Sequence, residues 1–253
     1  MKILNIYSVL AFFLIIAVGC DKTDEPAIGE CLITKQSYSD EDFSREILFF
    51  YNSNNQPIRL TGTTSTGFSG EAVLTYNATG QLIKAEGSLY APLAFYTYTY
   101  NTKNLLIRTE GFMSTGVLER KIEYEYNAFD QLISEKSFEN DQGTLVANFP
   151  RSYEYKTTTS KDYFIEKLFH TDGSLYSTTE YEYDDKKTPF GMIEPNGRTK
   201  NVVKETVKDA TGTVTSVKTI VYEYNSLGYP TKSVSNSTQF NGVETYTFTY
   251  DCK

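Results

Sequence analysis

The chain has 253 residues, with 24 Lys and Arg against 32 Asp and Glu, and a formal net charge of −8 at pH 7. Such an acidic protein repels phosphate backbones, so nucleic acid is not expected as a partner. The single histidine, His170, lies in a His-Thr-Asp-Gly turn sequence, which leaves no histidine cluster for a metal and no Ser-His-Asp arrangement. We therefore expect no metal, no cofactor and no enzymatic activity.

Residues 1–19 predict a bacterial lipoprotein signal peptide. Lys2 supplies a positive charge, an apolar segment follows, and the small residues 17–19 precede Cys20. The apolar segment is too short to be a spanning helix. Cleavage would leave Cys20 as a lipid-modified N-terminus, and the polar residues 20–30 would then tether the domain to the membrane. The alternative is an ordinary secretory peptide followed by an unmodified cysteine.

The rest of the chain, residues 31–253, is expected to form one domain built from a repeated phrase. An aromatic or apolar residue, any residue, a tyrosine, and then usually Asn or Asp recur along the chain. The second tyrosines are Tyr51, Tyr76, Tyr100, Tyr126, Tyr155, Tyr183, Tyr224 and Tyr250. Most steps are 24 to 29 residues and one is 41. A period of this length indicates one supersecondary unit per copy.

Each copy is predicted to contain two strands and two turns. Ile122, Tyr124 and Tyr126 alternate with charged residues such as Glu123 and Glu125, which is the pattern of a half-buried strand. Asn and Gly residues then predict a turn, and an apolar pair begins the next strand. Consecutive hairpins of this kind predict an all-β antiparallel meander of about sixteen strands.

One copy carries an insertion at residues 184–197. Its two prolines and two glycines predict a loop. Phe190, Met192 and Ile193 within it are candidates either for a plug packed on the sheet or for a binding surface. If the loop is a plug, Phe190→Asp should lower the free energy of unfolding by about 1–3 kcal/mol.

The segment Leu74-Thr-Tyr-Asn-Ala-Thr-Gly-Gln-Leu-Ile83 resembles the YD repeat of RHS-type proteins, which build shells from spiralling hairpins. Together with the Cys20 signal and the stretch Tyr183-Asp-Asp-Lys-Lys-Thr-Pro-Phe190, the repeats resemble uncharacterised lipoproteins of Bacteroidetes. The resemblance covers nearly all of residues 45–251. It implies a porin-like β-fold and brings no assigned activity.

The cysteines predict how the meander ends. Once Cys20 carries lipid, only Cys31 and Cys252 remain to form a disulfide. Export to the envelope would permit oxidation, and the bond would place the first and last strands side by side. We therefore expect a closed or nearly closed barrel; an open rolled sheet with two free thiols is the alternative.

The strand faces argue against an integral pore, because one face carries Thr, Glu and Lys and the other tyrosine, whereas a lipid-facing band is apolar. We expect a monomeric, non-catalytic lipoprotein at the outer membrane, facing the periplasm or the cell surface, that touches the membrane only through its lipid. It would bind a surface glycan, a peptide or a protein partner. A purely structural or assembly component of the outer membrane is the alternative, and an enzyme is the least favoured class.

Overall fold

A computed structural model describes residues 31–157, 162–189, 200–239 and 242–252. Cys20 and the loop residues Phe190, Met192 and Ile193 lie outside these ranges. The described chain forms a single sheet of seventeen antiparallel strands and one short 3-10 helix. Among the residues described, no helix has the length and apolar character that crossing a bilayer would require.

The elements follow one another as β1 (Cys31–Ser39), β2 (Ser44–Tyr51), β3 (Pro57–Thr64), β4 (Ser69–Tyr76), β5 (Leu82–Glu86), η1 (Ser88–Tyr90), β6 (Phe95–Tyr100), β7 (Leu106–Phe112), β8 (Leu118–Tyr126), β9 (Leu132–Asp141), β10 (Thr144–Ala147), β11 (Arg151–Thr157), β12 (Asp162–Phe169), β13 (Leu175–Tyr183), β14 (Val202–Asp209), β15 (Val214–Tyr224), β16 (Pro230–Ser237) and β17 (Val243–Cys252).

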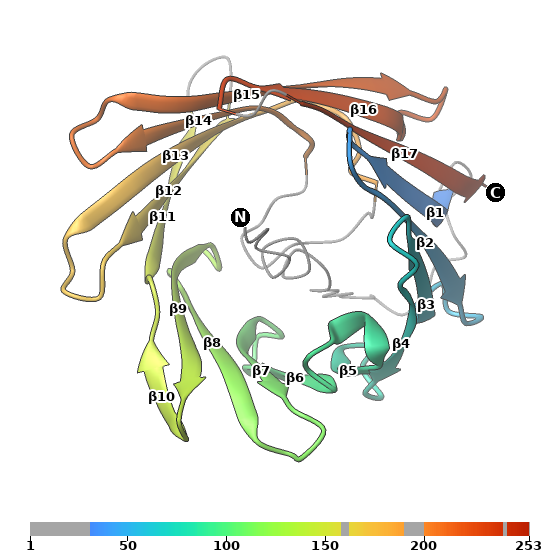
Figure 1. Ribbon diagram of the computed structural model, residues 1–253, viewed down its shortest axis with the longest axis horizontal. Helices are drawn as coiled ribbons and strands as arrows, with labels where there is room; N and C mark the ends of the chain where they lie inside the picture. Colours follow the sequence, from blue (N-terminus) through green and yellow to red (C-terminus); the bar gives the residue numbers. More distant parts are fainter. Residues whose placement is uncertain (1–30, 158–161, 190–199, 240–241, 253) are drawn as a thin grey trace.

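The sheet closes on itself (Figure 1). β1 pairs with β2 on one side and with β17 on the other, from Cys31 opposite Cys252 to Ser39 opposite Thr245. β10 pairs with β9 as the second arm of a hairpin, and β11 pairs directly with β9. The ring therefore contains sixteen strands, with β10 as one extra. The predicted antiparallel meander in a closed barrel is confirmed.

The Asn of each repeat builds the turn at one end of the barrel, which we call the Asn-turn end. The Asn77 Oδ1 atom accepts hydrogen bonds from the Thr79 and Gln81 backbone N–H groups at 3.1 and 2.9 Å. Gly80 follows at φ +84°, a conformation that glycine adopts without strain. The β4–β5 register then shifts by one residue at Tyr76. Equivalent Asn-centred turns begin at Asn52, Asn101, Asn127 and Asn225.

These repeated irregularities curve the sheet. Register shifts recur beside the second tyrosine where β2 meets β3, β6 meets β7, β8 meets β9 and β15 meets β16. Each bulge bends its strand and increases the local twist. Bulges placed once per repeat let a long meander close into a barrel.

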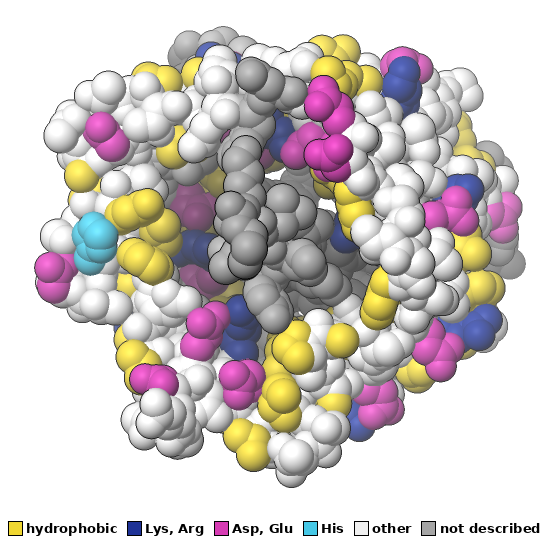
Figure 2. All heavy atoms as spheres, in the orientation of Figure 1, with side chains coloured by type: hydrophobic (Ala, Val, Ile, Leu, Met, Phe, Trp, Pro, Cys, Tyr) yellow, Lys and Arg dark blue, Asp and Glu magenta, His cyan; other side chains and the backbone are white. Residues whose placement is uncertain are grey.

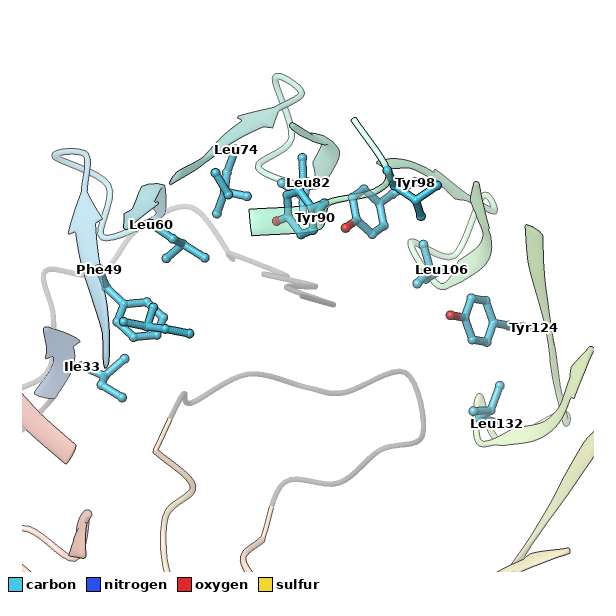
Figure 3. Packing of buried hydrophobic residues seen from close by; sticks show 14 of the residues in the cluster. Ile33, Phe49, Leu60, Leu74, Leu82, Tyr90, Tyr98, Leu106, Tyr124 and Leu132 are labelled. Atoms are coloured by element: carbon cyan, nitrogen blue, oxygen red, sulfur yellow. The ribbon is translucent and has the colours of Figure 1, made fainter. Parts of the chain in front are cut away.

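The core lies on the inner face of the barrel. Ile33, Leu82 and Leu132 are almost fully buried there. Figure 3 shows these side chains pointing from the wall toward the barrel interior, with Tyr98 and Tyr124 between them. Period-two alternation places one side chain of every neighbouring pair inside, as the sequence predicts.

The connection between β5 and β6 turns inward rather than forming a tight hairpin. It carries η1 and packs Leu89, Tyr90 and Leu93 against the core. Gly62 and Gly111 leave the room for it: a Cβ atom would lie 2.7 Å from Leu89 Cδ2 at Gly62 and 2.9 Å from Leu93 Cδ1 at Gly111. Residues 87–94 therefore fill part of the lumen, which the sequence did not predict.

Candidate functional site

The second tyrosine of five repeats holds neighbouring strands together. Its hydroxyl group donates a hydrogen bond to a backbone carbonyl near the start of the adjacent strand. These bonds run from Tyr51 to Ile33 at 2.7 Å, Tyr76 to Pro57 at 2.7 Å, Tyr100 to Leu82 at 3.0 Å, Tyr126 to Leu106 at 2.7 Å and Tyr250 to Pro230 at 2.7 Å. Because these hydroxyls already bond the backbone, the tyrosine ladder is part of the barrel's framework.

Burial keeps these phenols neutral. It raises the pKa of Tyr100 to about 12 and the pKa of Tyr51, Tyr76 and Tyr250 further. The cause is the removal of the charged phenolate from water, which favours the protonated form. A protonated hydroxyl can donate to a carbonyl, so the pKa shifts and the hydrogen bonds agree.

The inserted repeat uses a different arrangement. Tyr224 donates to the Asp184 carboxylate instead of a carbonyl, while Tyr222 donates to the Val202 carbonyl at 3.1 Å. The backbone N–H of Asn201 also donates to Asp184, at 3.3 Å. Asp184, the first residue of the insertion, is therefore linked to Asn201, which follows the insertion. The next residue, Asp185, is instead mostly exposed, at 84 % of its side chain.

A charged network crosses the lumen wall on β9, β11, β12 and β13. The Arg151 guanidinium lies 2.8 Å from Glu135 Oε1 through Nη1 and 3.2 Å from Glu166 Oε1 through Nε. Tyr153 donates to Glu135 and Tyr181 to Glu166, each at 3.1 Å. Burial opposes the charged guanidinium, but the two carboxylates outweigh it and raise the pKa of Arg151.

This network was missed by sequence reasoning. Arg151 lies two residues before Tyr153 and four before Tyr155, so strict alternation already puts its side chain on the tyrosine face. A charge on an inward-facing position was the available signal. The partners Glu135 and Glu166 come from other strands, and only the register of the sheet brings them together.

A second polar group lies near the end of the barrel opposite the Asn-turn end; we call it the mouth cluster and define it as Tyr38, Arg45, Lys218, Glu244 and Tyr246. The Lys218 Nζ atom lies 2.5 Å from Glu244 Oε2, and the Tyr38 and Tyr246 rings are 4.9 Å apart. Burial lowers the pKa of Arg45, while Tyr246 and Tyr38 oppose that shift. Figure 2 shows acidic and basic side chains gathered around this opening.

Beside the mouth cluster lies a hollow of about 350 Å³. Tyr38 and Arg45 line it, and most of its other lining residues carry hydroxyl groups: Ser37, Ser39, Ser44, Thr63, Thr64, Ser65, Thr245 and Thr247. The hollow and the mouth cluster together offer aromatic faces, hydrogen-bond donors and acceptors. That combination can hold a polar ligand.

Ion pairs between neighbouring positions lie along the outer wall of the barrel, among exposed apolar side chains such as Phe50, Val73 and Val221. The pairs are Lys35–Glu46, Lys84–Glu86, Arg108–Glu110, Lys121–Glu123, Lys136–Glu125, Lys167–Glu154, Lys204–Glu182, Lys208–Glu180 and Lys232–Glu223. Each exposed pair contributes little to stability. Their distribution matters more, because they place charges on most strands of this surface.

Cys31 and Cys252 form a disulfide that joins the ends of β1 and β17. Their Cα atoms are 4.0 Å apart across the strand pair. Within the described ranges, His, Cys, Asp and Glu residues nowhere gather in a group of three that could hold a metal ion.

Two solved structures share this architecture. A porin-like protein from Bacteroides vulgatus superposes with a TM-score of 0.61 at 9 % identity, over 88 % of this chain and 99 % of that chain. A porin-like protein from Bacteroides uniformis gives a TM-score of 0.57 at 10 % identity, over 87 % and 96 %. The chain has a porin-like β-barrel fold. No protein-family model and no curated protein sequence matches it.

Proposed function

We propose that the protein is a non-catalytic lipoprotein of the bacterial cell envelope whose barrel stands in water and binds a polar ligand, such as a surface glycan, at its mouth. Cys20 would carry the lipid, and residues 20–30 would lead to Cys31. Because Cys31 lies at the Asn-turn end, the tether would reach the barrel at that end. The mouth would then point away from the membrane. We place the protein at the outer membrane, facing the periplasm or the cell surface.

The observation that carries this proposal is the ion-paired outer wall. A membrane-embedded barrel presents an apolar band to lipid, and a charged residue in that band is strongly unfavourable. Here ion pairs project outward from β8, β13 and β14: Lys121–Glu123, Lys204–Glu182 and Lys208–Glu180. The fold is porin-like, and the charges on the outer wall support a barrel that stands in solvent.

The mouth cluster supports ligand binding better than the tyrosine ladder does. The ladder hydroxyls bond carbonyls of the barrel, so they are not available to a ligand. Glu244 and Lys218 line the opening, and the Ser235 hydroxyl donates to Glu244 at 3.0 Å. Tyr38 and Tyr246 add flat apolar faces, which suit sugar rings.

A purely structural role is the second candidate, and the tyrosine hydrogen bonds favour it. A framework that uses its repeated tyrosines internally needs no ligand to explain them. The two functions differ at the mouth, because a structural component would tolerate changes there without losing any partner.

The test is a screen of envelope glycans and peptidoglycan fragments with the full chain and two matched variants. Glu244→Gln removes a mouth carboxylate, and Glu180→Gln removes one from the outer wall. The two residues have equal exposure, 36 % of the side chain, and each pairs with a lysine. We expect a glycan that binds the unaltered chain and Glu180→Gln but binds Glu244→Gln at least about tenfold more weakly. Equal binding by both variants, or no hit, would favour the structural role.

A further inference from the structure

We propose that the free edge of β10 and an aromatic cluster beside it form a docking site for an extended basic peptide segment of another protein. The aromatic cluster consists of Phe149, His170 and Tyr176. This site lies away from the mouth cluster and goes beyond the proposed glycan binding, since it depends neither on that ligand nor on lipidation.

The first observation is an unpaired strand edge. β10 pairs with β9 from Thr144 opposite Asp141 to Ala147 opposite Phe138, and no other described strand pairs with it. The Asn148 N–H donates to the Ser137 carbonyl at 2.8 Å. In an antiparallel ladder the bonded positions alternate, so the backbone groups of Leu145 and Ala147 point away from β9.

The edge lacks the features that usually block pairing. Its sequence is Thr-Leu-Val-Ala, without a charge or a proline, and Val146 is about half exposed. Proteins commonly protect such edges with lysine, proline or a covering element. An uncharged, uncovered edge is suited to take up an added strand.

The second observation is the aromatic cluster itself. The Phe149 ring lies 5.8 Å from His170 and 5.5 Å from Tyr176, and His170 meets Tyr176 edge-on at 5.1 Å. All three are exposed at the barrel rim. Figure 2 shows the histidine in cyan beside hydrophobic side chains in yellow. Phe149 follows β10 by two residues, so the cluster continues the same edge.

The charges around this edge define the partner. Asp141 ends β9 in the β9–β10 hairpin, Asp172 lies in the turn after His170, and Asp209 lies opposite Ser177 on the next hairpin. None of the three has an ion pair among the described residues, whereas the basic residues of β8 opposite β9, Arg120 and Lys121, are paired with Glu139 and Glu123. Hydrogen bonds from the Ser174 hydroxyl and backbone hold the pKa of Asp172 below its usual range, so it stays charged. Lysine or arginine would be attracted here and could stack on the aromatic faces.

An extended peptide can satisfy all three features together. Its backbone would bond the outward groups of Leu145 and Ala147, which provides affinity, and its alternating side chains would provide specificity. A basic side chain next to the strand would reach the aromatic cluster and Asp172. The partner is therefore an extended segment in which basic and apolar residues alternate.

The probe is an acetylated, amidated peptide of alternating lysine and valine with a fluorescent label, titrated by anisotropy at physiological salt against the full chain. Phe149→Ala and Tyr176→Ala should each weaken binding by about tenfold. The matched control is Phe129→Ala, which removes the most exposed phenylalanine of the described residues, at 84 %, from the Asn-turn end. It should leave binding unchanged.

Two further reagents separate strand addition from simple charge attraction. Ala147→Pro removes an outward-facing N–H while sparing the bonded positions toward β9, so it should abolish binding with the fold retained by circular dichroism. A peptide of the same sequence with alternate backbone N-methyl groups should not bind. Equal binding by that peptide, by Ala147→Pro or by Phe149→Ala would overturn the proposal. So would self-association through this edge, seen by sedimentation as a dimer that Ala147→Pro dissociates.

Discussion

At the residue scale, the hydroxyl of the second repeat tyrosine explains why the phrase recurs. Tyr76 crosses from β4 to the first residue of β3 and satisfies its carbonyl. Phenylalanine could fill the same space without making this bond. Asn77 adds the turn that starts the next strand, so two adjacent residues specify both the contact and the reversal of the chain.

We predict that Tyr76→Phe lowers the free energy of unfolding by about 1 kcal/mol, because it removes one half-buried hydrogen bond and leaves the Pro57 carbonyl without that donor. Urea denaturation measures this change in the free energy of unfolding. The control is Tyr176→Phe, on a half-exposed ring at the rim, which should change stability by less than about 0.5 kcal/mol. Equal effects would contradict the role assigned to the hydroxyl.

The buried phenols also predict alkaline instability. Burial raises the folded-state pKa of Tyr100 to about 12, above the value of about 10 expected in the unfolded chain. Stability from such a group is fully present below pH about 10 and declines as pH rises toward the folded pKa. We expect cooperative unfolding above that pH, with tyrosinate absorbance appearing together with loss of the β-sheet circular dichroism signal. Ionisation of most of the tyrosines well before unfolding would contradict it.

Residue-scale sequence reasoning predicted the alternation and the turns, because both depend on neighbours along the chain. It could not assign the Tyr76 hydroxyl to Pro57, which lies on the adjacent strand. It also left Arg151 unnoticed, since its two carboxylate partners come from strands paired only in the folded sheet.

At the element scale, the junction between β9 and β11 is the shortest in the barrel. Only Arg151 opposite Glu135 and Ser152 opposite Ser134 are paired there, because β9 continues into the hairpin with β10. The Arg151 network spans this junction and extends to β12 and β13. Side-chain contacts thus compensate for a short backbone ladder.

We predict that Arg151→Ala destabilises the protein by about 1–3 kcal/mol, since it leaves Glu135 and Glu166 facing one another in the lumen wall. The lower part of that range reflects the partial exposure of the arginine. Hydrogen exchange should accelerate first in β9 and β11. Arg108→Ala, which removes an outer-wall pair with Glu110 at 3.4 Å, is the control and should have little effect. Uniform exchange changes across the barrel would argue against a local role.

The elements themselves were largely predictable, since each hairpin carries its own turn signal. The inward fold of residues 87–94 was not. It depends on Gly62 and Gly111, which are distant in sequence and provide space only when the barrel is formed. The prediction that Phe190, Met192 and Ile193 form either a plug or a binding surface stays a prediction, because these residues lie outside the described ranges.

At the scale of the whole molecule, closure joins the two ends of the chain. β1 pairs with β17 along eight residue pairs, and the disulfide closes a sequence separation of 221 residues. The sequence predicted that the first and last strands are neighbours, because only Cys31 and Cys252 remain to form a disulfide once Cys20 carries lipid. Closure also removes the edges that an open sheet of this size would expose.

We predict that Cys252→Ser lowers stability by up to about 5 kcal/mol through the larger entropy of its unfolded chain, less if that chain stays compact. The β1–β17 backbone pairs should keep the barrel closed. Urea denaturation with and without reductant measures the effect, and reductant should weaken the unaltered chain but not Cys252→Ser. Unreduced peptide mapping that finds two separately alkylated cysteines would contradict the bond.

We propose that this porin-like barrel stands in water and is held at the membrane by one lipid. Detergent phase partitioning of the exported full chain and of Cys20→Ala tests it most directly. We expect the unaltered chain to enter the detergent phase. Cys20→Ala, once residues 1–19 are removed, should enter the aqueous phase as a folded, disulfide-bonded monomer. Cys20→Ala that remains in the detergent phase after removal of residues 1–19 would contradict the proposal and indicate a barrel embedded in the bilayer.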